Sequence, residues 1–189
     1  ARLFSRIATG NWDAVIVTHA SFEKIPVSLS NRQKFIHSQV REIEQAIIEQ
    51  KREERGTRLV KELEKVKRRL ETKFKSLSAE QKKDHTLTFE ELGIDMLLVD
   101  EAHKLQNLFY VTKMTRVAGL PQTASERAFD LFLKVQHIQA KNNGGGVVFA
   151  TGTPISNTMA VRSNMQRYTQ ISGLRRNRLQ HFDSWASTY

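Results

Sequence analysis

The feature that most constrains the fold is a charged helical block at residues 31–90, about a third of the chain. Apolar residues recur there at helical spacing in two stripes, with Gly56 between them. Two helices of about 20 residues, each roughly 30 Å long, can cover both stripes by pairing antiparallel. The pattern therefore predicts an antiparallel helical hairpin of the coiled-coil kind, with one long helix that pairs with a second chain as the alternative. The stripes comprise Phe35, Ile36, Val40, Ile43 and Ile47, then Leu59, Leu63, Val66, Leu70 and Leu77.

The segments on either side of this block alternate apolar runs with helical periodicity. Continuous apolar runs at 14–18, 96–99 and 147–150 are typical of strands that are covered on both faces. A helix is expected at 123–140, where Thr123 and Glu126 have capping-box spacing, and another helix after the TGTP turn.

Strand, helix, strand and helix in succession predict an α/β fold, a parallel sheet flanked by helices. Residues 1–30 and 91–189 would form this domain, into which the helical block at 31–90 is inserted.

Polar residues follow two of the predicted strands, at 100–103 and at 151–154. In open parallel sheets, ligands bind beyond the carboxyl ends of the strands. An acid at such an edge can hold Mg²⁺ opposite nucleotide phosphates, and a second acid can orient or deprotonate a water molecule. Taken alone, each turn also has a plain structural interpretation. An acid pair often follows a surface strand, and the TGTP turn can be an ordinary strand-to-helix connection capped by Thr or Ser.

The longer strings resemble motifs of superfamily 2 helicases and translocases. VDEAHKLQN (99–107) resembles motif II of the SWI/SNF-like group, and ATGTPISNTM (150–159) resembles its motif III. WDAVIVTHASF (12–22) looks like an earlier strand motif of that group, and the three occur in the group's order. With FEELG and TRVAGLPQTASERAFD, the chain looks most like the helicase portions of large phage and mobile-element proteins, some of which carry an adenine-specific DNA methyltransferase domain.

The resemblance covers about 10–30 and 91–170, and it implies part of a RecA-like motor domain. Asp100 would then coordinate Mg²⁺, Glu101 would activate the hydrolytic water, and His103 would link the nucleotide site to a second motor domain. The positions that the resemblance assigns to coupling nucleotide state with nucleic-acid contacts, or to completing motif III, are Thr151, Gly152, Thr153, Pro154 and Asn157.

One departure from the group limits what the chain can do. A nucleotide site of this type needs a G-x-x-x-x-G-K-[ST] loop to cradle phosphates, and none occurs in the 189 residues. In the group, that loop precedes the strand at 14–18, and the second motor domain follows motif III. The resemblance therefore implies the second half of a first motor domain, with the P-loop half-domain and the second motor domain as its partners. ATP and Mg²⁺ would bind in the intact protein, whereas the chain alone is expected to bind no cofactor and to be inactive.

The charge balance indicates a polyanionic partner. Lys and Arg number 30 against 20 Asp and Glu, a formal balance of +10, which favours nucleic acid, with DNA preferred to RNA on the resemblance. A rival function follows, a non-catalytic nucleic-acid- or protein-binding module built on the helical hairpin. For both basic clusters the alternative is a solvated surface. The candidate nucleic-acid-binding residues are Lys65, Lys67, Arg68 and Arg69 in the helical block, and Arg175, Arg176 and Arg178 near the end.

Other features of the sequence exclude whole classes of site. Without cysteine there are no disulfides, thiolate zinc sites or thiol nucleophiles. No apolar run approaches the roughly 18 residues that span a bilayer, and no signal peptide is visible, so we expect a cytoplasmic protein with no membrane partner. Self-association through the helical block or through an exposed sheet edge is a further expectation.

Overall fold

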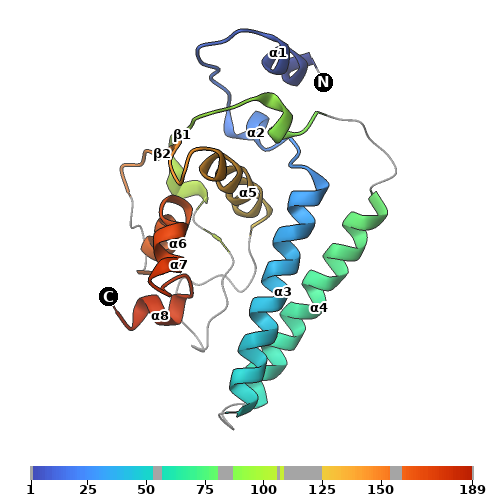
Figure 1. Cartoon of the computed structure of the whole chain (residues 1–189), viewed down its shortest axis with the longest axis vertical. Coiled ribbons are helices and arrows are strands. Elements are labelled where there is room, and N and C mark those ends of the chain that lie inside the picture. Colours follow the sequence, from blue (N-terminus) through green and yellow to red (C-terminus); the bar gives the residue numbers. More distant parts are fainter. Residues whose placement is uncertain are drawn as a thin grey trace. The chain divides into compact units, whose positions relative to one another are not determined.

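The computed structural model describes residues 2–52, 57–80, 87–105, 107–108, 125–153 and 159–188. The chain divides into two compact units (Figure 1). One unit contains the long helices α3 (Leu29–Arg52) and α4 (Thr57–Glu80). The other contains all the remaining described elements, from α1 (Arg2–Thr9) to α8 (Phe182–Ala186).

The unit of α3 and α4 agrees with the predicted helical hairpin. The helices lie side by side, and each has 24 residues, against about 20 expected. Ion pairs join Glu44 to Lys67 at 2.7 Å and Lys51 to Glu64 at 3.5 Å. The later residue of α3 pairs with the earlier residue of α4, so the two helices are antiparallel. Gly56, the predicted break, lies outside the described residues. The buried apolar side chains are Ile36, Ile43, Ile47, Leu63 and Leu77.

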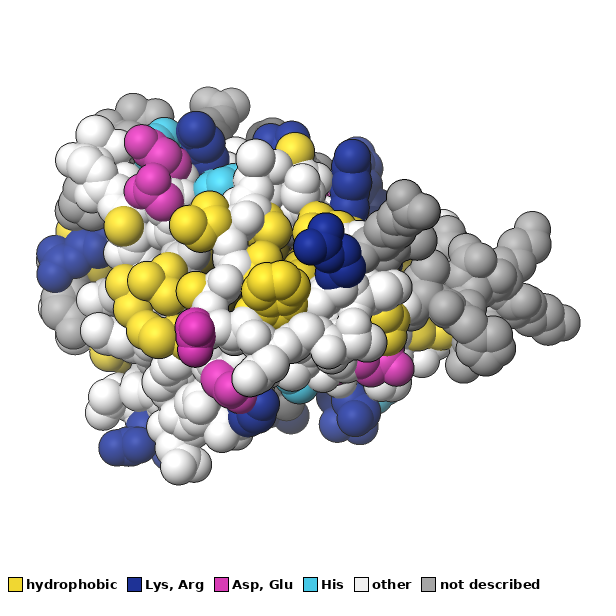
Figure 2. All heavy atoms as spheres, turned by 90° about the horizontal axis from the view of Figure 1, so that it is seen from above, with side chains coloured by type: hydrophobic (Ala, Val, Ile, Leu, Met, Phe, Trp, Pro, Cys, Tyr) yellow, Lys and Arg dark blue, Asp and Glu magenta, His cyan; other side chains and the backbone are white. Residues whose placement is uncertain are grey.

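The sheet of the other unit is small. Strands β1 (Leu97–Val99) and β2 (Val147–Phe149) pair in parallel, which confirms the strands predicted at 96–99 and 147–150. Helix α5 (Glu126–Lys141) packs against β2. Leu98 and Val148 face each other in register and are 69% and 45% exposed. One face of the sheet is therefore open to solvent. The apolar runs had predicted strands that are covered on both faces. Figure 2 shows hydrophobic side chains gathered on one surface of the molecule.

The predicted α/β fold, a partial RecA-like parallel sheet flanked by helices, is wrong. The described residues are mostly helical, and their sheet has two strands. The run at 14–18 forms no strand, and Ile16 within it is 99% exposed. An apolar, β-branched run becomes a strand only where a neighbour pairs with its N–H and C=O groups, and no described residue does so here. Thr18 instead caps α2 (His19–Phe22), and its hydroxyl oxygen accepts a hydrogen bond from the Ser21 N–H.

Helix α5 is the centre of this unit. It is buried on nearly every side, as expected of a helix surrounded by other elements. The helix is capped by Ser125, whose Oγ accepts from the Ala128 N–H at 3.1 Å. The predicted capping residue Thr123 lies outside the described residues. The buried apolar residues along one face of the helix include Ala128, Leu131, Phe132, Val135 and Ile138.

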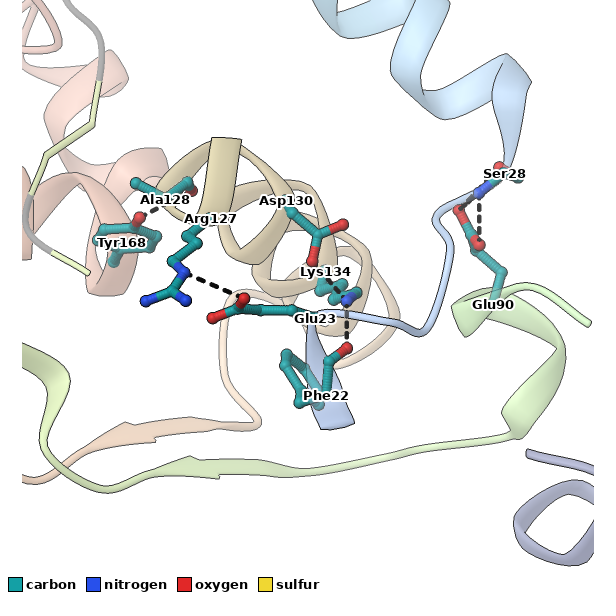
Figure 3. Close-up of polar contacts among 9 residues, drawn as sticks. All are labelled: Phe22, Glu23, Ser28, Glu90, Arg127, Ala128, Asp130, Lys134 and Tyr168. Carbon is teal, nitrogen blue, oxygen red and sulfur yellow. Dashed lines mark hydrogen bonds and ion pairs between the residues drawn. The ribbon is translucent and has the colours of Figure 1, made fainter. Parts of the chain in front are cut away.

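A buried ion pair fixes α5 to α2 (Figure 3). The side chain of Lys134 is fully buried, and its Nζ lies 2.5 Å from Asp130 Oδ2, one turn earlier on the helix. The same ammonium group donates to the Phe22 carbonyl at 2.8 Å and lies 4.3 Å from the centre of the Phe22 ring. Arg127 on α5 also pairs with Glu23 at 3.0 Å. Charged side chains of α5 thus hold the short α2 helix in place.

Tyr168 connects α6 (Met159–Thr169) to the same core. Its hydroxyl donates to the carbonyls of Ala128 at 2.8 Å and Leu105 at 3.1 Å, and burial raises the pKa of the phenol well above its usual value. After α6, helices α7 (Ile171–Arg176) and α8 complete a second apolar cluster, in which Phe182 and Trp185 are buried. Among the helices that the structure describes, none is both long enough and apolar enough to cross a bilayer.

Candidate functional site

The two polar turns predicted to bind nucleotide lie side by side. The register pairs Val99 with Phe149, so the chain leaves β1 and β2 at the same edge of the sheet. Hydrogen bonding continues past the strands, because the Ala150 N–H donates to the Val99 carbonyl at 2.8 Å and the Ala102 N–H donates to the Ala150 carbonyl at 3.1 Å. The acidic turn at 100–101 is therefore held against the start of the TGTP turn.

Glu101 has an unusual backbone conformation. Its φ is 52°, in the left-handed region that few residues other than glycine adopt. Strain of this kind costs on the order of 1–3 kcal/mol and persists only where neighbouring contacts hold it. Here the Glu101 N–H donates to Asp100 Oδ1 at 2.9 Å, and Glu101 Oε2 lies 2.9 Å from His103 Nδ1. These two contacts restrain the backbone and the carboxylate of Glu101.

His103 joins the acidic turn to the TGTP turn. It lies in the short 3₁₀ helix η2 (Ala102–Leu105), and its Nδ1 is also 3.4 Å from the hydroxyl of Thr151. The Thr151 hydroxyl in turn accepts from the Thr153 N–H at 3.2 Å. Glu101, His103 and Thr151 therefore form a continuous polar chain across the two strand ends.

His19 is a member of the site that the sequence patterns did not single out. From the start of α2, its Nε2 lies 2.8 Å from the backbone carbonyl of Asp100, 81 positions along the chain. This contact places a third segment beside the acidic turn. The signal in the sequence was the same one that marked the other two turns, a polar residue at the end of an apolar run, here the run at 14–18.

The acids suit a cation that is shared with a ligand. Asp100 and Glu101 are exposed, and carboxylate oxygens are the ligands that Mg²⁺ prefers in proteins. Within the described ranges, no group of three or more Asp, Glu, His or Cys side chains could enclose a metal ion. Mg²⁺ is commonly bound through one or two carboxylates, with water molecules and substrate phosphates as the other ligands, and this donor set fits that mode.

The remaining candidate residues fall into three groups. Gly152 and Thr153 are exposed at the TGTP turn, while Pro154 and Asn157 lie outside the described residues. In the hairpin, Lys67 pairs with Glu44 and, at 3.6 Å, with Glu71. The other candidate cations are exposed, and they are Lys65, Arg68 and Arg69 on α4 and Arg175, Arg176 and Arg178 at the end of α7 and just after it.

Comparison with known proteins places the chain in a family. A family model described as a probable helicase domain matches residues 1–189. The chain is also 30% identical over 104 residues to Defense against restriction protein B of Escherichia phage P1, a match that spans 54% of this chain and 5% of that protein. No solved structure shows a significant match. Because the family model covers the whole chain, this chain belongs to the probable helicase domain family.

Proposed function

We propose that this chain is part of a nucleic-acid-dependent ATPase, a DNA helicase or translocase of the SWI/SNF-like DEAH group. In this proposal the acidic turn is one edge of the nucleotide site. Asp100 binds Mg²⁺ through its carboxylate, and Glu101 orients the attacking water and accepts its proton. Membership of a helicase-related family and the DEAH and TGTP strings support this assignment.

The observation that carries the proposal is the polar chain from Glu101 through His103 to Thr151. A general base is effective only when its carboxylate is held in one direction, and the contact with His103 Nδ1 at 2.9 Å provides that restraint. Because the same imidazole nitrogen faces the Thr151 hydroxyl, movement of the TGTP turn changes the position of the base. The contact thereby gives a physical route by which hydrolysis is coupled to movement of the following segment.

The phosphates of ATP need further residues. The 189 residues contain no G-x-x-x-x-G-K-[ST] string, so in this proposal the phosphate-binding loop comes from another part of the protein that contains this chain. Mg²⁺ when bound neutralises charge on the β- and γ-phosphates. The residues present supply one side of such a site, the cation-binding carboxylate and the base.

The test is the ATPase activity of the longer protein that contains this chain, measured with and without DNA. Glu101→Gln removes the base but keeps the size of the side chain, and kcat should fall by roughly 10²- to 10⁴-fold while the affinity for ATP changes little. Asp95→Asn is the matched control, because Asp95 is an exposed acid at the opposite end of β1, paired with Lys141. Hydrolysis by Glu101→Gln at the rate of the control would rule out the assignment of the base.

A further inference from the structure

The exposed face of α4 carries a stripe of cations. At about 100° per residue, the six residues of the stripe fall within roughly a third of the helix circumference. The buried Leu63 and Leu77 lie on the opposite side, against α3. Every side chain of the stripe except that of Thr72 is positively charged. We define the stripe as Lys61, Lys65, Arg68, Arg69, Thr72 and Lys75.

Within the part of the hairpin that the structure describes, these charges form no ion pair. No carboxylate of the described residues lies within ion-pair distance of the five cations of the stripe. Lys67 differs from the cations of the stripe. It is two positions from Lys65 but points to the other side of the helix, where it pairs with Glu44 and Glu71. The hydrogen bond to Glu44 raises the pKa of Lys67. Helical phase thus divides the basic run into one structural lysine and a set of cations open to a partner.

The surface around the stripe is hollowed. An open depression of about 680 Å³ lies beside the middle of α4, and its described lining includes four of the five cations and Thr72. The one acid in that lining is Glu64, which is paired with Lys51 from α3. The depression therefore presents cationic groups and a hydroxyl, all of which can donate hydrogen bonds to anionic oxygens.

We propose that the stripe is a docking surface for the phosphate backbone of duplex DNA. From Lys61 to Lys75 the stripe is about 21 Å long at 1.5 Å per residue. A duplex of that length carries about 12 phosphates at one charge per roughly 1.7 Å, more than the five cations of the stripe. The stripe includes no aromatic side chain on which unpaired bases could stack, which favours a duplex over a single strand. The choice of DNA over RNA rests on the proposed function. The match between the cations of the stripe and a phosphate backbone is independent of that function.

The proposal is tested by DNA binding of the full chain without nucleotide, followed by fluorescence anisotropy over a series of salt concentrations. One variant combines Lys65→Ala, Arg68→Ala and Arg69→Ala, and alanine preserves the helix. Its matched control combines Lys34→Ala, Arg41→Ala and Arg52→Ala, which removes the same charge from exposed positions on α3, the other helix of the hairpin. If each α4 cation neutralises one phosphate, the salt slope becomes shallower by about 2.7, and affinity at 0.1 M salt falls roughly 10²- to 10³-fold. The control should retain most of its affinity.

Other outcomes overturn the proposal. Equal losses in the two triple variants would mean that DNA responds to the net charge of +10 and not to the stripe. If the α4 variant lost affinity for poly-glutamate as steeply as for duplex DNA, the stripe would be a surface for acidic polypeptides. Lys67→Ala is a second control within the same helix, and circular dichroism of each variant shows whether the hairpin is intact. Because no nucleotide is present, failure here leaves the ATPase proposal standing, and failure of Glu101→Gln leaves this one standing.

Discussion

Replacement of Lys134 by methionine tests how the core around α5 is held together. The lysine side chain has no exposed surface, and its partner Asp130 keeps 12% of its side-chain surface. Methionine has nearly the same length and shape, so Lys134→Met removes the charge with little change in packing. The change also removes the hydrogen bond to the Phe22 carbonyl and the cation over the Phe22 ring.

The magnitude follows from the burial of the pair. Removal of one partner of a buried ion pair costs about 3–5 kcal/mol, because the other charge stays in a medium of low dielectric. This cost in free energy already includes most of the contribution of the hydrogen bond to the Phe22 carbonyl, so that contribution is not added to it. For a chain of this size, each kcal/mol lowers Tm by about 2–4 °C, so Lys134→Met should melt roughly 6–20 °C lower. The double variant Lys134→Met/Asp130→Leu removes both charges and should recover to within about 1 kcal/mol of the unaltered chain.

The assay is chemical denaturation of the single and double variants, followed by circular dichroism. Lys141→Met is the matched control, since Lys141 is on the same helix and pairs with Asp95 at the surface, where an ion pair is worth about 0–1 kcal/mol. If Lys134→Met lost no more stability than Lys141→Met, the pair would contribute nothing to the core. If the double variant were less stable than Lys134→Met, the two charges would not be coupled as described.

Two further predictions concern local hydrogen bonds. Tyr168→Phe removes the donor to the carbonyls of Leu105 and Ala128 and should cost about 1–3 kcal/mol in denaturation experiments; a loss near zero would show that other donors replace the hydroxyl. Hydrogen bonds from the Thr88 backbone and side chain lower the pKa of Glu91 in the folded chain. The ionised Glu91 carboxylate therefore contributes its full stabilisation above the unfolded pKa of about 4.3, and this stabilisation is lost as pH falls through the lower folded pKa. Glu91→Gln should therefore flatten the dependence of Tm on pH in that acidic range, and an unchanged profile would refute the assignment.

The sequence predicted the elements whose signals are local. The hairpin helices, α5 and both strands of the sheet follow from periodicities of 3.6 or from short apolar runs. The run at 14–18 carries the same apolar signal as the run at 96–99, yet only the second is a strand. The difference is the neighbour, because β1 has β2 at hydrogen-bonding distance, whereas no described strand pairs with 14–18. Pairing joins residues far apart in sequence, so no pattern within the run could have decided it.

The candidate site shows the same division. The proximity of Asp100, Glu101 and Thr151 was predictable, because parallel strands bring their carboxyl ends to one edge. The left-handed backbone of Glu101 and the contact of His19 with the Asp100 carbonyl were not, since both depend on the turn geometry and on where α2 lies. Lys134 was missed for a related reason. Its sequence position looks like the polar face of an amphipathic helix, and only the packing of α2 over that face buries it.

The sequence prediction groups the four cations of the basic run of α4 as one candidate surface. Their positions relative to the apolar stripe nevertheless separate one of them from the rest. The four are Lys65, Lys67, Arg68 and Arg69. Leu63 and Leu77 fix the side of the helix that faces α3, and Lys67 falls nearer to that side than Lys65 or Arg68 does. A lysine at the border of an apolar stripe is within reach of acids on the facing helix, and Glu44 meets it there. The two cations on the far side cannot reach those acids, because the helix itself stands between them. Helical phase relative to the apolar stripe, more than the number of charges in the run, determines which cations hold the hairpin together and which remain exposed.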